Sequence, residues 1–440
     1  MDTAAEASRR GLSVTLFEGA EIGGTCLNAG CIPTKALVRN AEVLSQFKSA
    51  DRFGIDNFTF EFDFDKVMER KNNVVAALRQ GAESVLQAAK VNVVKAFASF
   101  KDATTVLTPD GEEYTADNII IATGSTSRSL PIPGADLECV MDSTRILSID
   151  HIPESLTIIG GGVIGMEFAS IFNAFGSHVT VVEYMKQILP PFDSDIAKRL
   201  KQNLSKQGID IITSAAVTGI SQTSDYEILT TYECKGKQGE VQSTDILMAV
   251  GRKPATEGLN LAAAGVETNP RSGAVIVNEM MQTNVPHIYA IGDANGGVML
   301  AHVATFEGIR ALNAIQGKED SIDFSIIPSA VFTSPECGMA GVTSDQCKEK
   351  GIAVKTGTAF YRANGKAMAM DETEGICKLI FAAEDEKLIG AHIMGAQAAD
   401  LAQQAADLMA RGTTRQQLCD IIFSHPTVSE LLLNAARNVK

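Results

Sequence analysis

The first 122 residues alternate between helical and extended hydrophobic patterns. Residues 1–10 form an alanine-rich segment typical of a short helix, Gly11 ends it, and residues 12–17 form an extended apolar run that ends in Glu18. Apolar residues then recur with helical spacing over 36–47 and 64–90. Short β-rich runs follow, and the last, 118–122, is continuously apolar, which is typical of a parallel strand covered on both faces.

Residues 155–183 carry a complete βαβ pattern: a strand, a glycine turn, a helix ending at Gly176, and a second strand ending at Glu183. IYAIGDANG, beginning at Ile288, predicts another buried strand that runs into a glycine turn. From Ile326 onward, alternating strands precede two helical segments, which is typical of an α+β domain. The sequence thus predicts an α/β protein with two Rossmann-like dinucleotide-binding domains and a C-terminal α+β domain.

Length and composition narrow the class of protein. A chain of 440 residues is too long for one compact core, and about 150 residues per domain suggests about three domains. The formal charge of −15 disfavours nucleic acid as a partner. No basic flank precedes an apolar N-terminal segment, and the most apolar window, 156–176, contains Glu167 and a phosphate-loop pattern of glycines. We therefore expect a cytoplasmic enzyme without a membrane partner.

Gly160, Gly162 and Gly165 form a G-x-G-x-x-G pattern directly after the apolar strand. In this pattern the first glycine permits the turn, the second lets a pyrophosphate approach, and the third lets the helix pack on the strand. Glu183 at the next strand's end can accept hydrogen bonds from a ribose 2′-hydroxyl and repel a 2′-phosphate, so NAD is favoured over NADP. Lys186 could soften that repulsion. The alternative is a tight turn that binds nothing.

Cys26 and Cys31 lie in the stretch GGTCLNAGCIPTK. A disulfide needs Cα atoms within roughly 7 Å, whereas five residues of regular helix already rise about 7.5 Å, so a bond between them requires a distorted turn. Gly30 and Pro33 would permit one. Zinc is the alternative, but no second close pair of Cys or His accompanies this one. Two unrelated thiols are a further alternative, and the other six cysteines are expected to be inert thiols.

GGTCLNAGCIPTK resembles the active-site signature of the pyridine nucleotide–disulfide oxidoreductases, the group of glutathione reductase and dihydrolipoamide dehydrogenase. Five further stretches resemble motifs of that family in the family's order, so that the similarity covers nearly the whole chain: IIIATGS (119–125), IIGGGVIGMEFAS (158–170), MAVGRKPAT (248–256), IYAIGDANGGVMLAHVATFEG (288–308) and FSHPTVSE (423–430).

The resemblance implies roles for individual residues. Cys31 would be the charge-transfer thiol next to the flavin and Cys26 the interchange thiol that faces the substrate. His425 would be the acid–base residue, oriented by Glu430, and would reach the cysteines from the partner subunit of a homodimer. The cofactors FAD and NAD would be bound by Glu18, Gly24, Thr25, Lys35, Thr123, Gly124, Gly160, Gly162, Ile164, Gly165, Glu167, Glu183, Gly251, Gly292, Asp293 and Ala301, with no metal.

Some of these cofactor roles are specific. Glu18 would hold the adenosine ribose of FAD, Asp293 would bind its ribitol, and Lys35 would pair with Glu167 beside the flavin. The implied domains are an FAD-binding domain (1–147), an NAD-binding domain (148–254), a central domain (255–325) and a dimerisation domain (326–440).

Glu183 resembles the NAD-using branch, and the best fit is to the dihydrolipoamide dehydrogenase type, whose partner is a small dithiol, for example on the lipoyl domain of a 2-oxoacid dehydrogenase complex. VVEYMKQILP (181–190) lacks the arginines that glutathione reductase relatives use for NADPH. A mercuric reductase-like or other small-disulfide reductase is the alternative, although the C-terminal LLLNAARNVK lacks the cysteine pair of mercuric reductases.

Members of this family open with a strand and a G-x-G-x-x-G loop that holds the FAD pyrophosphate, and Met1 falls just after the expected end of that loop. One interpretation, which we favour because the later catalytic residues are present, is that the natural protein has about 10 to 15 more residues. The other is a flavin-poor relative that acts as a binding or scaffold protein. A visible spectrum of the purified chain distinguishes them.

Overall fold

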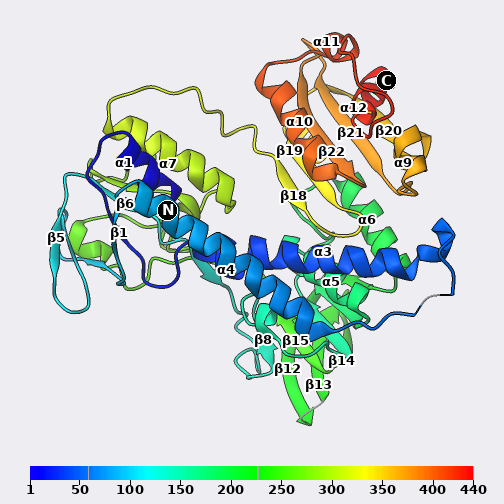
Figure 1. Ribbon diagram of the computed structural model, residues 1–440, viewed down its shortest axis with the longest axis horizontal. Helices are drawn as coiled ribbons and strands as arrows, with labels where there is room; N and C mark the ends of the chain where they lie inside the picture. Colours follow the sequence, from blue (N-terminus) through cyan, green and yellow to red (C-terminus); the bar gives the residue numbers. More distant parts are fainter. Residues whose placement is uncertain (58, 225–226, 440) are drawn as a thin grey trace. The chain divides into compact units, whose positions relative to one another are not determined.

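The computed structural model describes residues 1–57, 59–224 and 227–439 (Figure 1). The chain divides into two compact units, each built from three stretches. The first unit comprises residues 1–36, 65–128 and 251–322, and the second comprises residues 37–64, 129–250 and 323–440. None of the helices in the described ranges combines the length and the apolar character that crossing a membrane requires.

The first unit is a mixture of helices and small sheets. Its elements are α1 (Asp2–Arg9), β1 (Thr15–Phe17), α2 (Gly24–Ala29), most of α4 (Phe64–Ala88), β2 (Asn92–Val94), β3 (Ser99–Phe100), β4 (Thr105–Leu107), β5 (Glu113–Thr115), β6 (Ile119–Ile121), β7 (Ser125–Ser127), β16 (Arg252–Pro254), η3 (Leu261–Ala264), β17 (Ile288–Ala290), η4 (Gly292–Asn295) and α7 (Ala301–Ile315). Two separate parallel pairs, β1 with β2 and β6 with β17, form its parallel sheets.

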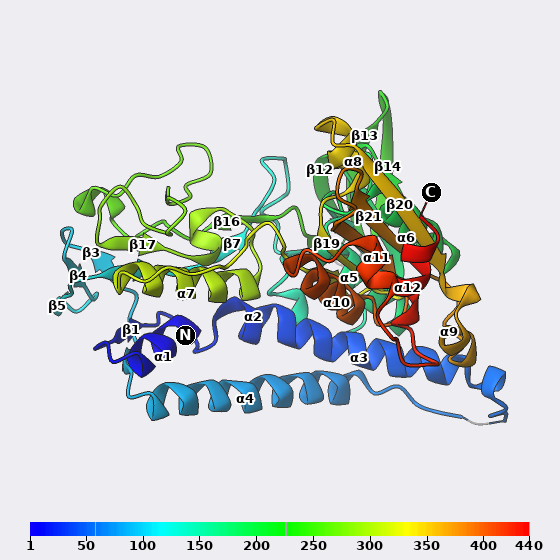
Figure 2. The ribbon, with the colours of Figure 1, turned by 90° about the horizontal axis from the view of Figure 1, so that it is seen from above.

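Helix α1 packs beside α7 in this unit (Figures 1 and 2). The approach is close, because a Cβ placed on Gly308 would lie only 2.0 Å from Thr3 Oγ1. The apolar positions of α1 and α4 form a core with Ile22 and Val91. The predicted strand at 118–122 is parallel as expected, but of its three paired residues only Ile121 is buried. Within the described residues β17 is the one strand that pairs with it, which leaves the other edge open.

A five-stranded parallel sheet in the order β11-β10-β9-β15-β8 forms one part of the second unit. Helix α5 (Val163–Phe175) connects β9 to β10, and α6 (Ser194–Lys206) connects β10 to β11, as in a Rossmann-like sheet. The strands are β8 (Val140–Met141), β9 (Ser155–Ile159), β10 (His178–Glu183), β11 (Asp210–Thr213) and β15 (Asp245–Met248). The apolar residues of the central strands β10, β9 and β15 are buried, as expected for a parallel sheet with helices on its faces, whereas those of the edge strand β11 are half-buried.

This unit also contains a three-stranded antiparallel sheet that the hydrophobic pattern did not predict: β12 (Ala215–Ser224), β13 (Glu227–Cys234) and β14 (Lys237–Ser243). Lys235 and Gly236 join β13 to β14, both with positive φ. A two-residue connection with positive φ at both positions is the preferred geometry of a tight hairpin. The K-G dipeptide between two alternating runs was the signal that could have revealed it.

The C-terminal part of the second unit is an antiparallel sheet in the order β18-β19-β22-β21-β20, which confirms the predicted α+β character. Its strands are β18 (Ser329–Val331), β19 (Cys337–Gly341), β20 (Val354–Phe360), β21 (Ile376–Ala382) and β22 (Leu388–Met394). Helices α10 (Ala398–Ala410) and α12 (Glu430–Arg437) pack on the sheet and bury a continuous core with it (Figure 2). The remaining helices of the described residues are α3 (Cys31–Lys48), η1 (Ala50–Phe53), η2 (Ile146–Ser148), α8 (Ser344–Glu349), η5 (Tyr361–Ala363), α9 (Gly365–Ala369) and α11 (Arg415–Cys419).

Candidate functional site

Cys26 and Cys31 belong to the first unit and lie on two consecutive helices. Cys26 is in α2, and Cys31 is the first residue of α3 (Cys31–Lys48), with Gly30 between the two helices. Their sulfurs are bonded, and their Cα atoms are 4.6 Å apart, well inside the range that a disulfide spans. The predicted disulfide is therefore present. The other six cysteines are free thiols.

The break at Gly30 brings the two cysteines together. A Cβ at this position would lie 2.9 Å from the carbonyl oxygen of Thr25, so the chain can fold back this closely only because the residue is glycine. The carbonyl oxygen of Gly30 accepts hydrogen bonds from the backbone N–H of Thr34, at 3.2 Å, and from its hydroxyl, at 2.6 Å. Both cysteines are half-buried, which leaves part of the disulfide open to a small thiol.

His425 and Glu430 lie together in the second unit, where the loop after α11 leads into α12. The Nδ1 atom of His425 is 3.1 Å from Glu430 Oε1 and 3.2 Å from Oε2. The imidazole is largely exposed, with 77% of the side chain accessible, whereas Glu430 is mostly buried. Among the described residues, none forms a hydrogen bond with Nε2 of His425.

Glu430 remains ionised in this setting. The backbone N–H of Thr427 donates to its carboxylate at 3.0 Å, and this bond, together with the contact from His425, lowers the pKa of Glu430 below its ordinary value. An ionised carboxylate accepts a hydrogen bond from Nδ1–H and thereby leaves Nε2 as the proton acceptor of a neutral imidazole. The pair can therefore take up a proton at Nε2 and stabilise the resulting cation.

The glycine loop of the second unit follows the expected design. Gly160 has a φ of +111°, and a Cβ there would lie 2.4 Å from the carbonyl oxygen of Ala249. A Cβ on Gly165 would lie 2.0 Å from the carbonyl oxygen of Gly160, so only glycine lets α5 pack this close to the strand. A Cβ on Gly162 would enter open space at the start of α5, where Ile164 is half-buried in the first turn. This leaves room for a pyrophosphate at the helix N-terminus.

Glu183 lies at the end of β10, directly beside this loop, and is 6% exposed. Its carboxylate accepts hydrogen bonds from the backbone N–H groups of Gly161 and Met185. The residue therefore holds the loop in place through two backbone bonds, a contact that the sequence pattern did not indicate. Its assignment as the ribose ligand stays a prediction.

Asp293, the predicted ribitol ligand, is part of a small polar cluster in the first unit. The hydroxyl of Ser125 donates to its carboxylate, and Nε of Arg252 donates to the same hydroxyl oxygen at 2.7 Å. Arg252 also lies 4.0 Å from the carboxylate. Ser125 and Arg252 were missed as site residues, although both stand inside stretches that resemble family motifs, 119–125 and 248–256.

Glu307 on α7 adds a second buried carboxylate next to this cluster. Its side chain accepts hydrogen bonds from the backbone N–H of Gly292, at 2.6 Å, and from Asn295, at 3.0 Å. Burial raises the pKa of Glu307, and these bonds offset that rise only in part. The carboxylate fixes the turn after β17 and so positions Asp293.

The other predicted cofactor residues lie where strands or helices begin or end. Glu18 follows β1 and accepts the N–H of Ala20 at 3.0 Å. Lys35 is on α3 in the first unit, and Glu167 is buried on α5 in the second, where its Oε1 accepts the N–H of Phe332 at 2.9 Å. Their pairing stays a prediction. Elements of the first unit carry the remaining six at their ends or in adjoining loops: Gly24, Thr25, Thr123, Gly124, Gly251 and Ala301.

Comparison with known proteins places this arrangement in a family. Residues 1–308 match the pyridine nucleotide-disulphide oxidoreductase family, and residues 327–436 match the dimerisation domain of that family. Dihydrolipoyl dehydrogenase from Geobacillus stearothermophilus is 37% identical over 437 residues, covering 98% of this chain and 92% of that protein. Dihydrolipoyl dehydrogenase from Bacillus subtilis (strain 168) is 38% identical over 437 residues, covering 98% and 94%.

A solved structure has the same architecture. The HOCl-induced flavoprotein disulfide reductase RclA from Escherichia coli matches with a TM-score of 0.88 and 31% identity, covering 100% of this chain and 97% of that one. The predicted fold class, two nucleotide-binding domains with a C-terminal dimerisation domain, is confirmed. The bonded cysteines, the glycine loop and these full-length similarities lead to one conclusion: the chain belongs to the pyridine nucleotide-disulphide oxidoreductase family.

Proposed function

We propose that this chain is a dihydrolipoyl dehydrogenase, which oxidises a small dithiol and reduces NAD+. The observation that carries the proposal is the Cys26–Cys31 disulfide, held half-buried across the Gly30 break. Similarity to dihydrolipoyl dehydrogenases at 37–38% identity over almost the whole chain supports the choice of substrate.

The cysteines carry out thiol–disulfide exchange. One substrate thiolate attacks Sγ of Cys26, forms a mixed disulfide and releases Cys31 as a thiolate. The second substrate thiol, as its thiolate, then attacks the substrate sulfur that is bonded to Cys26. This releases Cys26 as a thiolate and closes the substrate disulfide. The substrate loses two electrons, and the protein disulfide gains them as two thiols.

His425 handles the protons of this exchange. Its Nε2 accepts the proton of each attacking thiol, since only a thiolate is a competent nucleophile. Glu430 holds Nδ1 through the contacts at 3.1 and 3.2 Å and stabilises the imidazolium that forms. Glu430 acts through His425 and is thus a positioning residue.

The enzyme uses FAD and NAD, the cofactors of its family. The residues present suit both cofactors: the loop at Gly160 leaves open space in front of α5, and Asp293 presents a carboxylate fixed by Ser125 and the turn at Gly292. We assign Glu183 and the glycine loop to NAD, and Asp293 and Glu18 to FAD. When bound, FAD would supply the two-electron redox chemistry that links the reduced cysteines to NAD+.

We further propose a homodimer, which the dimerisation domain at 327–436 supports, with His425 of one subunit serving the disulfide of the other. A lipoyl domain of a 2-oxoacid dehydrogenase complex would be the partner that delivers the dithiol. The six free thiols agree with a reducing compartment, which we take to be the cytoplasm. The four-domain division at residues 147, 254 and 325 stays a proposal.

The substrate is tested by a comparison of electron donors and acceptors with the purified protein. We expect dihydrolipoamide to reduce NAD+ with a kcat/KM at least about tenfold above the values for NADH oxidation by glutathione disulfide, mercuric ion, Cu(II) or quinones. A tenfold preference corresponds to roughly 1.4 kcal/mol of differential transition-state binding. If mercuric ion or glutathione disulfide were the best acceptor, the small-disulfide reductase alternative would replace this assignment.

The histidine–glutamate pair gives a second prediction. His425→Ala should lower kcat by about 10² to 10⁴-fold, the usual contribution of a general acid–base group. Glu430→Gln removes the negative charge that stabilises the imidazolium, so kcat should fall by about tenfold while KM stays within a few-fold. Steady-state kinetics with dihydrolipoamide and NAD+ measure both variants. An unchanged kcat in Glu430→Gln would leave that residue a purely structural role.

A further inference from the structure

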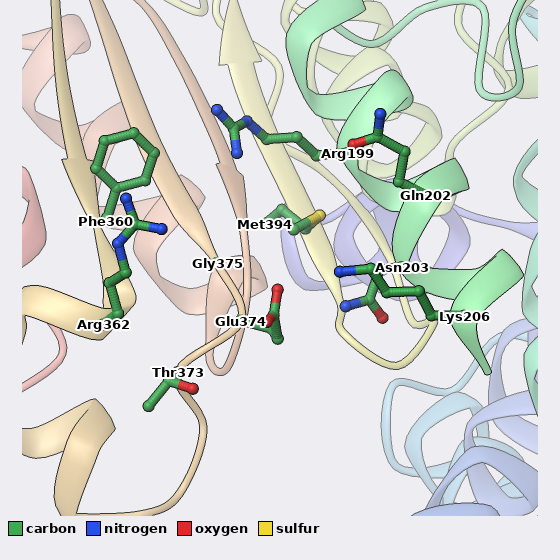
Figure 3. Close-up of a pocket in the computed structure, with 10 residues that line it drawn as sticks. All are labelled: Arg199, Gln202, Asn203, Lys206, Phe360, Arg362, Thr373, Glu374, Gly375 and Met394. Atoms are coloured by element: carbon green, nitrogen blue, oxygen red, sulfur yellow. The ribbon is translucent and has the colours of Figure 1, made fainter.

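A cavity of about 300 Å³ lies in the second unit, and its lining includes no residue of the glycine loop or of the His425–Glu430 pair. One wall is a single face of α6, which presents Arg199, Gln202, Asn203 and Lys206 at helical spacing. The opposite wall comes from the end of β20 and from the turn before β21. The residues there are Phe360, Arg362, Thr373, Glu374 and Gly375, and the buried Met394 completes the lining. Figure 3 shows Arg199 extending from α6 and the guanidinium of Arg362 beside the Phe360 ring.

The charge of this cavity is opposite to that of the chain. Three cationic side chains and one carboxylate line it, a balance of +2, whereas the whole protein carries −15. Within the described part of the chain, no carboxylate lies within ion-pair distance of Arg199, Lys206 or Arg362. The three cations repel one another, and a bound anion would relieve that repulsion.

Phe360 holds two of these cations in place without neutralising them. The guanidinium carbon of Arg362 lies 4.9 Å from the centre of the ring, and that of Arg199 lies 5.3 Å from it. A cation over an aromatic face keeps its N–H groups free for an anion, because the ring contributes no hydrogen-bond acceptor in their plane. The arginines are thus ordered in advance for an anion.

We propose that this cavity binds the phosphate or diphosphate group of a small molecule. Guanidinium groups match phosphate oxygens in bidentate fashion, and an ammonium group adds a point charge. Arg199, Arg362 and Lys206 hold the phosphoryl oxygens, and the amides of Gln202 and Asn203 donate further hydrogen bonds. The volume suits a ligand at the small end of the usual range for binding pockets. This site is separate from the proposed dithiol chemistry and does not depend on it.

The experiment is titration calorimetry on the flavin-containing protein saturated with NAD+, so that the nucleotide sites are occupied. The probes are inorganic phosphate, pyrophosphate and a sugar phosphate, which distinguish the free ion from a phosphoester. We expect one pyrophosphate per chain, and we expect Arg362→Gln and Lys206→Gln each to weaken binding by about tenfold or more, the usual effect of losing one charge-assisted contact.

Lys198→Gln is the matched control, because Lys198 is exposed on the same helix, carries the same charge and does not line the cavity. This variant should bind pyrophosphate as the unmodified chain does. Loss of binding in Lys198→Gln to the same degree as in Lys206→Gln would show only general charge attraction and would overturn the proposal. So would the absence of binding to the unmodified chain at millimolar probe, or wild-type affinity in Arg362→Gln. Thermal unfolding of each variant checks that the fold is intact.

Discussion

Cys31→Ser should reduce dithiol-dependent NAD+ reduction on the order of 10³-fold or more, because serine can neither form the disulfide nor leave as a thiolate. In the folded chain Cys31 begins α3 and is bonded to Cys26 across the Gly30 break. Without that bond the substrate dithiol has no internal oxidant. Loss of the reaction should therefore be nearly complete at any substrate concentration.

The measurement is the initial rate of NADH formation with dihydrolipoamide, with matched flavin content in both proteins. Cys139→Ser is the control, since Cys139 is a half-buried free thiol outside the pair and should leave the rate unchanged. Far-UV circular dichroism of both variants shows whether folding is retained. A Cys31→Ser protein that kept a rate within a few-fold of the unmodified chain would remove the disulfide from the mechanism.

The second large effect is expected at Lys378, a buried lysine in β21. Its Nζ atom donates to both carboxylate oxygens of Asp193, at 2.9 and 3.0 Å, and to Asp195 at 2.7 Å. Asp193 is fully buried, caps α6 through the N–H of Asp195, and also accepts the N–H of Ser344. This network ties α6 to the C-terminal sheet within the second unit.

Lys378→Met should destabilise the protein by about 3–5 kcal/mol, because it leaves Asp193 as a buried charge without its partner. Lys378→Met combined with Asp193→Asn should recover much of that loss, since asparagine still caps the helix but carries no charge. Denaturant unfolding followed by circular dichroism measures both proteins. A change below about 0.5 kcal/mol for Lys378→Met would show that water reaches Asp193 and replaces the ion pair.

The same network predicts a dependence on pH. Burial by itself raises the pKa of Asp193, but the bonds from Lys378 and the N–H of Ser344 outweigh burial, and the net pKa is lowered. A lowered folded-state pKa gives stability that is present above the ordinary aspartate pKa and is lost as the pH falls through the folded-state value. For Lys378, burial lowers the pKa, yet the bonds to Asp193 and Asp195 raise it overall. Its contribution persists at low pH and is lost only at alkaline pH.

Local pattern predicted the parts of the fold that are local in origin. The strand, turn and helix around Gly160 and the break at Gly30 follow from residues within ten positions of each other. Glycine at those positions predicts a tight turn, because no other residue tolerates such a close approach of the backbone. Gly30 and Pro33 also indicated the distorted turn that a disulfide between Cys26 and Cys31 needs, and the family resemblance favoured the disulfide over a zinc site.

The sequence did not predict contacts between distant segments. Lys378 lies in an apolar strand, ICKLIFA, and no residue near it in the sequence indicates that it forms an ion pair with Asp193. Ser125 meets Arg252 because β7 and β16 pair antiparallel, and it meets Asp293 because the preceding strands β6 and β17 pair in parallel. Glu183 was predicted from its place at a strand end, but its bonds to Gly161 and Met185 depend on how the loop folds back. Such contacts arise from tertiary packing, which residue spacing does not encode.

In this mechanism one reversible disulfide accepts two electrons from a dithiol and passes them to NAD. Counting the thiols of the denatured protein after anaerobic treatment shows whether it does. The chain has eight cysteines, of which six are free in the folded structure, so the oxidised protein should titrate as six thiols. Dihydrolipoamide should raise the count to eight, and NAD+ should return it to six. A count that stays constant through both additions would contradict the account.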